Sequence, residues 1–221
     1  MITEAANRLL ASQKGVEQLY NSLEIAGRKY LLCELPRLLT RWYYDNSSFK
    51  RDRWLKLAAA RYNDTNSLAV ALLHLKQYYP VALPHRLYRL TNLGYTDIPD
   101  NKIVTLEKGT ALRPLISFTN LRNPVVEDRN NQRGDVVLEW KPIGSLILAN
   151  YKTLSEIARD ALEFISVNKE SVQRELGISI SVPKNRWMRA RGEISGYSNE
   201  QEYLVYLSKP IKCTWREYKV S

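Results

Sequence analysis

The stretch YSNEQEYLV at residues 197–205 brings a turn, two carboxylates and an apolar run together. Gly196 and the following Tyr-Ser-Asn predict the turn, and residues 203–207 are rich in β-favouring side chains and predict a strand. Because residues i and i+2 of an extended chain project to the same side, we expect Glu200 and Glu202 to face one cleft. The stretch therefore predicts a strand whose start delivers a pair of acids.

Other short β-type runs accompany this strand along the C-terminal part of the chain. They lie at residues 86–90, 103–106, 115–119, 136–140, 146–149, 178–182, 203–207 and 211–218. One amphipathic helix is predicted at residues 153–166, with a capping box formed by Thr153 and Glu156 and a continuous apolar stripe. Residues 120–134 contain Asn-Pro, Asn-Asn and several charges, which predict a long exposed loop.

The first 80 residues have a helical pattern instead. Leucine and alanine recur at helical spacings after a cap at Thr3, and further helices are predicted at 53–62 and 67–79. Pro36 should end or kink a helix. The sequence therefore predicts an α+β protein of two domains: a helical N-terminal lobe over residues 1–82, and a mainly β domain over residues 83–221 with a helix laid against it.

Composition is that of an ordinary soluble protein, with 44% hydrophobic and 25% charged residues. No apolar run approaches the roughly 18 residues that span a bilayer, and the N-terminus has no signal-peptide pattern. We therefore expect a cytoplasmic protein with no membrane partner. Cys33, Cys213, His74 and His85 show no metal-ligand spacing, so no metal site is predicted. No glycine-rich phosphate loop occurs.

Lysine and arginine outnumber the acids 33 to 23, which gives a net charge of +10 and favours an anionic partner. Nucleic acid, a phosphate-bearing cofactor and an acidic protein all fit, as do lysines that serve solubility alone. The basic run Lys184, Arg186, Arg189 and Arg191, with Trp187, combines phosphate-pairing charge with a stacking ring, which is typical of a nucleic-acid patch. A solvated face with a core tryptophan is the alternative.

Three short motifs follow one another in the second domain. They are Leu87-Tyr88-Arg89, Ser117-Phe118-Thr119 and Glu200-Gln201-Glu202. This order of arginine, Ser-x-Ser/Thr and Glu-x-Glu resembles the Arg-Ser-Glu class of mono-ADP-ribosyltransferases, and more narrowly the small enzymes of that class carried by tailed phages. The resemblance covers residues 83–221 in pattern. It implies a mixed β-sandwich ADP-ribosyltransferase-like catalytic core there, acting in the host cytoplasm during phage takeover.

Two residues depart from the family pattern. Leu90 follows the arginine where the family commonly has glycine, which bears on how closely the backbone approaches the cofactor. The middle motif is Ser-Phe-Thr where well-known members have Ser-Thr-Ser, so Thr119 must supply the second hydroxyl unless that hydroxyl is dispensable.

These residue types suit the chemistry that the resemblance implies. Breaking the bond between nicotinamide and ribose in NAD builds oxocarbenium-like charge on the sugar, and a nearby carboxylate stabilises that transition state more than the ground state. The resemblance assigns this role to Glu202. By the same resemblance, Glu200 would orient the acceptor guanidinium or take its proton. Arg89 would bind the cofactor phosphates, and Ser117 would hold Glu202 or the ribose in place.

Tyr88, Phe118 and Thr119 complete the expected NAD-binding set with Arg89, Ser117 and Glu202. The resemblance thus predicts an enzyme that transfers ADP-ribose from NAD to arginine side chains of an acceptor protein. We expect that protein to be associated with nucleic acid; RNA itself is the other acceptor considered. Because the basic run at 184–191 precedes the Glu-x-Glu loop, we expect it to border the acceptor side and to favour an acidic or phosphate-bearing target. The alternative is a non-catalytic basic protein that binds nucleic acid through residues 50–61 and 184–191.

Overall fold

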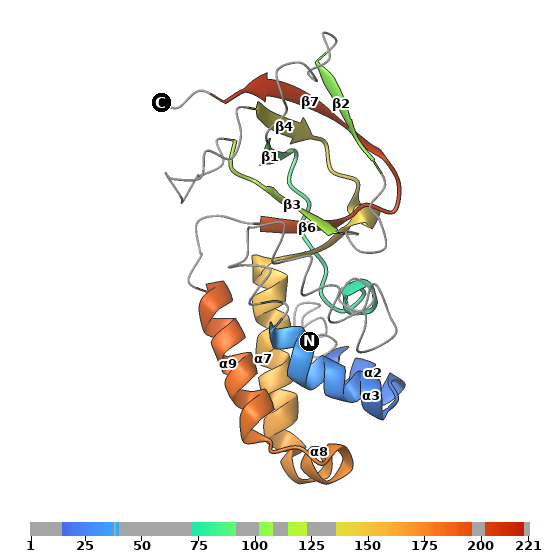
Figure 1. Ribbon diagram of the computed structural model, residues 1–221, viewed down its shortest axis with the longest axis vertical. Helices are drawn as coiled ribbons and strands as arrows, with labels where there is room; N and C mark the ends of the chain where they lie inside the picture. The colour runs from blue at the N-terminus through green and yellow to red at the C-terminus, as the bar shows by residue number, and fades with distance from the viewer. Residues whose placement is uncertain are drawn as a thin grey trace, which may run out of the picture. The chain divides into compact units, whose positions relative to one another are not determined.

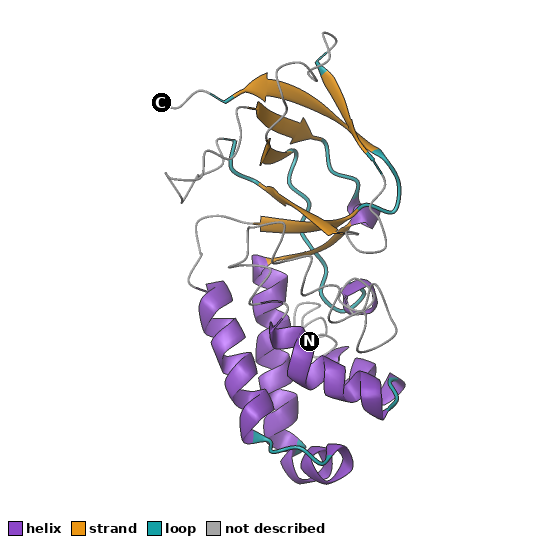
Figure 2. Ribbon diagram, in the orientation of Figure 1, coloured by secondary structure: helices purple, strands orange, loops and turns teal. Residues whose placement is uncertain are grey.

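A computed structural model describes residues 15–37, 39, 72–91, 102–107, 115–122, 136–195 and 202–218 of the chain. The chain forms two compact units (Figure 1). The helical unit comprises Met1–Val81 with Tyr151–Tyr197, and the β unit comprises Ala82–Asn150 with Ser198–Ser221. Helices fill the first and strands the second (Figure 2), so the molecule is α+β, as predicted. The predicted division was 1–82 and 83–221; in the structure, residues 151–197 group with the N-terminal segment instead.

The helical unit is built from short N-terminal helices and three later ones. They are α2 (Gly15–Ser22), α3 (Ile25–Lys29), the π-helical η1 (Tyr30–Glu34), α7 (Tyr151–Val167), α8 (Lys169–Leu176) and α9 (Ser181–Ser195), with further helical turns at 35–37 and 72–75. Of the helix predicted at 67–79, the structure describes residues 72–79, and residues 72–75 are helical. The predicted cap at Thr3 and helix at 53–62 lie outside the described residues.

Helix α7 is the central element of this unit. Its apolar stripe, with Ile157, Ala158 and Ala161 at 0–1% exposure, packs against α2 and α9. The predicted helix at 153–166 is therefore confirmed. The capping box was wrong, because the helix begins at Tyr151 and the buried Thr153 lies within its first turn. Tyr151 and Leu154 are buried together with the stripe, so the first turn of the helix includes residues before the local capping signal.

The predicted strand at 178–182 was also wrong. Gly177, at φ +58°, ends α8 in the left-handed conformation that glycine favours, and its N–H donates to the Gln173 carbonyl at 3.0 Å. Helix α9 then begins at Ser181. Pro183 lies in its first turn, where a missing N–H costs nothing. The buried residues Trp187, Ala190 and Ile194 follow at helical spacing.

Pro36 does not end its helix. Residues 35–37 remain helical, and the preceding segment Tyr30–Glu34 is π-helical, with the Leu35 N–H bonded to the Tyr30 carbonyl. A proline ring collides with the carbonyl four residues before it in a regular α-helix, and the wider π turn is a usual way to relieve such strain.

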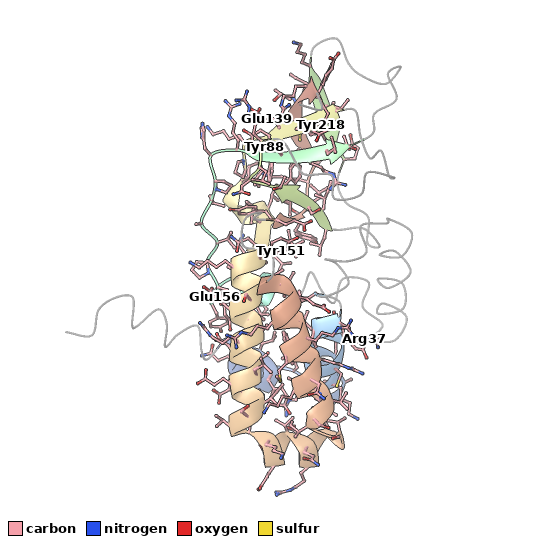
Figure 3. All side chains as sticks on the ribbon, turned by 90° about the vertical axis from the view of Figure 1, so that its left-hand side faces the viewer. Arg37, Tyr88, Glu139, Tyr151, Glu156 and Tyr218 are labelled. Atoms are coloured by element: carbon pink, nitrogen blue, oxygen red, sulfur yellow. The ribbon has the colours of Figure 1, made fainter. Side chains whose placement is uncertain are left out.

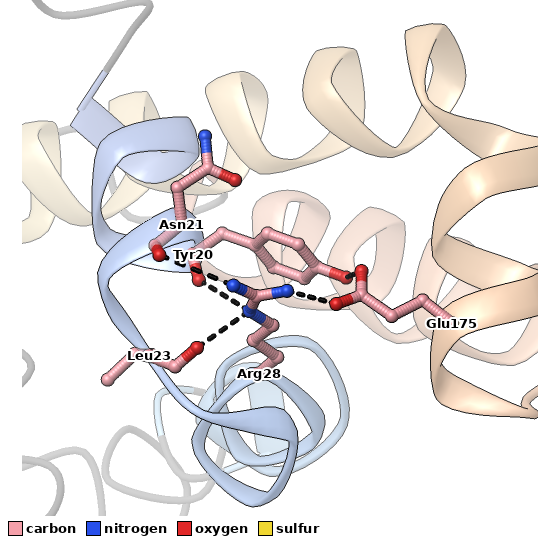
Figure 4. A network of polar contacts seen from close by, with 5 residues as sticks. All are labelled: Tyr20, Asn21, Leu23, Arg28 and Glu175. Atoms are coloured by element: carbon pink, nitrogen blue, oxygen red, sulfur yellow. Dashed lines mark hydrogen bonds and ion pairs between the residues drawn. The ribbon is translucent and has the colours of Figure 1, made fainter.

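A polar network ties α2 and α3 to α8 (Figure 4). The Tyr20 hydroxyl donates to Glu175 Oε2 at 2.8 Å, and Arg28 forms an ion pair with Glu175 Oε1. Arg28 Nε also donates to the carbonyls of Leu23 and Tyr20, at 2.7 and 3.0 Å. One arginine thus fixes the turn between two short helices and joins it to a third element. Burial is the main cause that raises the pKa of the Tyr20 hydroxyl.

A second network lies inside the helical unit. Asp160 on α7 is 1% exposed. Its Oδ2 accepts a hydrogen bond from the Tyr79 hydroxyl at 2.7 Å, and its Oδ1 accepts one from Arg159 Nε at 3.0 Å. Burial raises the pKa of the Asp160 carboxyl, although both hydrogen bonds act in the opposite direction.

The β unit holds seven strands in one sheet. They are β1 (Leu87–Thr91), β2 (Ile103–Leu106), β3 (Leu115–Thr119), β4 (Val136–Trp140), β5 (Ile147–Asn150), β6 (Glu202–Tyr206) and β7 (Ile211–Glu217), in the order β2-β7-β4-β1-β3-β6-β5, and a 3-10 turn at Gly144–Leu146 precedes β5. The strands β2, β3 and β4 have the predicted bounds, and the other four differ by a residue at one or both ends. All of these strands pair antiparallel, so the described sheet is open and purely antiparallel where a mixed β-sandwich was expected.

The sheet has a weak junction between β1 and β3. β1 pairs with β4 over its whole length, and β3 pairs with β6 over its whole length, whereas β1 and β3 share the single pair Tyr88↔Thr119. The strand runs β2-β7-β4-β1 and β3-β6-β5 therefore meet at one pair of residues, between the strands that Figure 1 labels β1 and β3. Across the junction, the buried ring of Phe118 packs on that of Trp140, with 5.3 Å between centroids.

None of the helices in the described ranges is both long enough and apolar enough to cross a membrane.

Candidate functional site

Arg89 and Ser117, which are 28 residues apart in sequence, contact each other at the junction between β1 and β3. Arg89 Nη1 donates a hydrogen bond to the Ser117 carbonyl at 2.8 Å and lies 3.5 Å from the Ser117 hydroxyl oxygen. Both side chains are half-buried. The sheet therefore brings together the arginine and the serine that the sequence placed in one site.

This contact replaces part of a β-ladder. Continuing the register beyond Tyr88↔Thr119 would pair Leu90 with Ser117, yet that pair is absent from the described β1–β3 ladder. The strands part there, and the Arg89 guanidinium supplies a donor that the neighbouring backbone does not. A partly buried carbonyl that lost its donor would cost free energy, so this hydrogen bond stabilises the point where the strands part. The same bond fixes the orientation of the planar guanidinium.

The hydroxyls of the Ser-Phe-Thr motif and Glu202 share one face of the β3–β6 ribbon. Thr119 pairs directly with Glu202, and Ser117 pairs with Leu204, so these four side chains project to the same side. Diagonal neighbours on such a face lie about 7–8 Å apart, which relates Ser117 to Glu202. Glu202 is half-buried and is the first residue of β6. The prediction that the strand begins at Tyr203 thus missed it by one position.

Phe118 occupies the opposite face of the same ribbon. It is 1% exposed and packs on Trp140. The structure therefore gives Phe118 a position in the core of the β unit, and its part in cofactor binding stays a prediction. Thr119 is also buried, at 6% exposure, and its hydroxyl oxygen accepts a hydrogen bond from the Leu121 N–H at 3.1 Å. That bond holds the chain where it leaves β3.

Tyr88 lies next to two charged residues that the sequence analysis did not single out. Glu139 on β4 pairs with Tyr88 in register and forms an ion pair with Arg86. Figure 3 shows Tyr88 and Glu139 close together among the strands. A lone glutamate between apolar residues, as in Val-Leu-Glu-Trp, was a signal for an ion pair, but only strand pairing identifies its partner.

The remaining predictions concern Glu200, two segments, the cysteines and the absence of a metal site. Glu200 lies outside the described residues, as do the loop residues 123–134 and the segment 50–61. Cys33 and Cys213 belong to different units, and burial raises the pKa of the Cys213 thiol to about 12. Within the described ranges, no three histidine, cysteine or acidic side chains gather where they could hold a metal ion.

The basic run at 184–191 is helical. Some of its side chains are therefore buried and others are exposed. Trp187 is 0% exposed, so its ring is part of the core and cannot stack on a base. Arg186 is half-buried, and its Nη1 donates to the Cys33 carbonyl at 2.6 Å. Lys184, Arg189 and Arg191 are exposed. The predicted combination of charge and stacking ring was therefore wrong, and the core tryptophan of the alternative is what the structure contains.

Comparisons with protein-family models, with curated proteins and with solved structures found no match to this chain.

Proposed function

We propose that the protein is an NAD-dependent mono-ADP-ribosyltransferase whose active site lies in the β unit. The proposal includes an ADP-ribosyltransferase-like organisation of this unit and, from the phage resemblance, action in the cytoplasm of a host cell. One observation carries it: Leu-Tyr-Arg, Ser-Phe-Thr and Glu202, the last residue of Glu-x-Glu, are far apart in the sequence and lie on three neighbouring strands, β1, β3 and β6.

The geometry of these strands supports the proposal in two ways. First, the contact between Arg89 and Ser117 occurs where β1 and β3 part, so a polar, half-buried surface forms at a break in the sheet. Second, Glu202 stands on the Ser117 face of the adjoining ribbon. Alternation along β1 places Arg89 on the Phe118 face, and its guanidinium reaches Ser117 where the strands part. A guanidinium, a hydroxyl and a carboxylate are the groups that this proposal requires for binding a pyridinium dinucleotide.

Each group has a defined task in the proposed reaction. Arg89 binds a phosphate of NAD through its planar fork, and Ser117 donates to the ribose or to Glu202. The bond between the ribose C1′ and nicotinamide breaks, and the electron pair leaves with nicotinamide. Glu202 stabilises the oxocarbenium-like charge by accepting a hydrogen bond from a ribose hydroxyl. An acceptor nitrogen then bonds to C1′ and gives up one proton.

The acceptor in this proposal is an arginine side chain. Glu200 would orient the guanidinium and take the proton as the new bond forms. We therefore expect Glu200→Gln to abolish transfer while leaving much of the slow hydrolysis of NAD. Equal loss of transfer and hydrolysis would argue against a separate acceptor role for Glu200.

The test is NAD turnover with a matched pair of variants. The protein is incubated with NAD labelled in its adenylate part and with a cell extract, and both released nicotinamide and labelled acceptor are measured. Glu202→Gln should lower both by about 10²–10³-fold, the usual loss when a charge-stabilising group is removed. Glu217→Gln, the same change at an exposed position of β7, should have no effect.

The proposal fails if the intact protein releases no nicotinamide under any condition, or if Glu202→Gln and Glu217→Gln behave alike. Arg89→Lys adds a finer test. It keeps the charge and loses the fork, so the KM for NAD should rise more than kcat falls. Circular dichroism of each variant separates a loss of activity from a loss of folding.

A further inference from the structure

Helix α9 has one face that packs and one that does not. Pro183, Trp187, Ala190 and Ile194 are buried, and the helix packs against α7 and η1; Figure 1 shows it beside α7. The opposite side is exposed along the whole helix. We call this side the outer face of α9; its defining residues are Lys184, Asn185, Met188, Arg189, Arg191 and Gly192.

Positive charge lines both edges of the outer face. At 3.6 residues per turn, Lys184 and Arg191 fall along one edge and Arg189 along the other. Asn185, Met188 and Gly192 lie between them and carry no charge. The acid of this helix, Glu193, is half-buried and forms an ion pair with Arg189 Nε at 2.7 Å, which offsets part of the charge on the Arg189 edge. The outer face itself therefore contains cations and no acid.

Gly192 is a second, independent feature of this face. A glycine inside a helix destabilises it relative to alanine, so such a glycine usually has a packing reason. Here no atom of the described residues lies within 4 Å of the position that a Cβ would occupy. Packing against the described part of the chain therefore does not account for it. Its effect is to leave the helix backbone open to close approach from outside.

We propose that the outer face of α9 binds the sugar-phosphate backbone of a nucleic-acid duplex. The helix, about 10–12 Å across, matches the major groove of B-form DNA, which is about 12 Å wide. Lys184 and Arg191 on one edge would meet one line of phosphates, and Arg189, ion-paired with Glu193 but largely exposed, would meet the other. The small, uncharged centre permits close approach. Because Trp187 is in the core, binding uses charge without base stacking, so duplex is bound at least as well as single strand and without sequence preference. This inference does not depend on the proposed transferase activity.

The first experiment measures binding of the whole protein to a labelled DNA duplex of mixed sequence, and to one of its single strands, over a range of salt concentrations. The variant carries Lys184→Gln, Arg189→Gln and Arg191→Gln. The control carries Lys169→Gln, Lys209→Gln and Lys212→Gln, which remove the same charge from exposed positions elsewhere. We expect the dependence of log K on log salt to weaken by about 0.9 for each outer-face cation removed, and to change less in the control.

The second experiment uses Gly192→Ala. A methyl group at an open helical position should raise the melting temperature and, on this proposal, should weaken duplex binding severalfold. Unchanged duplex binding in the stabilised variant would overturn the inference that the duplex closely approaches the helix backbone at Gly192. Absence of duplex binding, equal losses in the outer-face variant and the control, or preference for polyglutamate over duplex would overturn the nucleic-acid assignment. Released nicotinamide, measured in parallel, reports on the transferase proposal separately.

Discussion

Replacing Tyr79 by phenylalanine should destabilise the helical unit through one hydrogen bond. The hydroxyl donates to Asp160 Oδ2 at 2.7 Å, and both side chains are 1% exposed. The change removes one oxygen atom and leaves the ring in place, so packing is preserved. What remains is a buried carboxylate oxygen without that donor, which no water can reach without rearrangement of the surrounding helices.

The size of the effect should depend on pH. Loss of a hydrogen bond to a charged group costs about 1.5–3 kcal/mol, and to a neutral one about 0.5–1.5 kcal/mol. Burial raises the pKa of Asp160 above the value of about 3.9 in an unfolded chain. The folded state therefore holds this proton more tightly, and the group's contribution to stability is greatest below pH 4 and is lost as pH rises through the folded pKa.

The Tyr79 hydroxyl lowers the pKa of Asp160, because it stabilises the charged form. Tyr79→Phe should raise that pKa further, so the free energy lost should be about 2 kcal/mol above the folded pKa, where Asp160 is ionised, and about half of that below it, where Asp160 is protonated. For a chain of this size, 1 kcal/mol corresponds to about 2–4 °C in melting temperature.

The assay is urea unfolding followed by far-ultraviolet circular dichroism at several pH values. Tyr78→Phe provides the matched control, since Tyr78 is the neighbouring tyrosine, is half-buried and contacts His74 through its ring. Equal losses in the two variants, or a larger loss from Tyr79→Phe at acid pH than at neutral pH, would refute the account of the Asp160 network.

Three further changes test other parts of the structure. Phe118→Ala should cost about 3–5 kcal/mol of unfolding free energy, because the ring is buried against Trp140. Phe118→Leu should retain most of the stability, and NAD turnover that survives in this variant would assign Phe118 to the core alone. Gly177→Ala should destabilise by about 1 kcal/mol in thermal unfolding, because φ is +58° there. Iodoacetamide at pH 8, followed by peptide mass spectrometry, should modify the half-buried Cys33 well before Cys213, whose thiol pKa is raised to about 12 by burial; equal rates would contradict that burial.

The strands were the most predictable part of the fold. The runs at 103–106, 115–119 and 136–140 are dense in β-favouring residues and are bounded by turn residues, so local preference and tertiary structure agree. The run at 178–182 looked similar, yet Pro183 and the spacing of Trp187, Ala190 and Ile194 belong to a helix. A short apolar run suits either state, and packing against α7 decided it.

The candidate site shows the same division. The order of the motifs was visible in the sequence, and the strand at 115–119 was predicted there, which by alternation places Ser117 and Thr119 on one side. Alternation could not show that Phe118 faces Trp140, or that Arg89 bonds to the Ser117 carbonyl. Both contacts cross from one strand run to the other, and their partners are set by which strands pair.

By itself, the sequence determined the α+β class, the positions of most strands, the presence of the amphipathic helix predicted at 153–166 and the residues available for chemistry. These depend on periodicity and on side-chain type within a few residues. Only the tertiary structure decided that residues 151–197 join the N-terminal helices, that β1 and β3 touch at one pair, and that Trp187 is buried while Lys184, Arg189 and Arg191 are exposed. Those outcomes depend on which apolar surfaces meet. The free energy of burying them is shared between segments distant in sequence, and no local pattern specifies it.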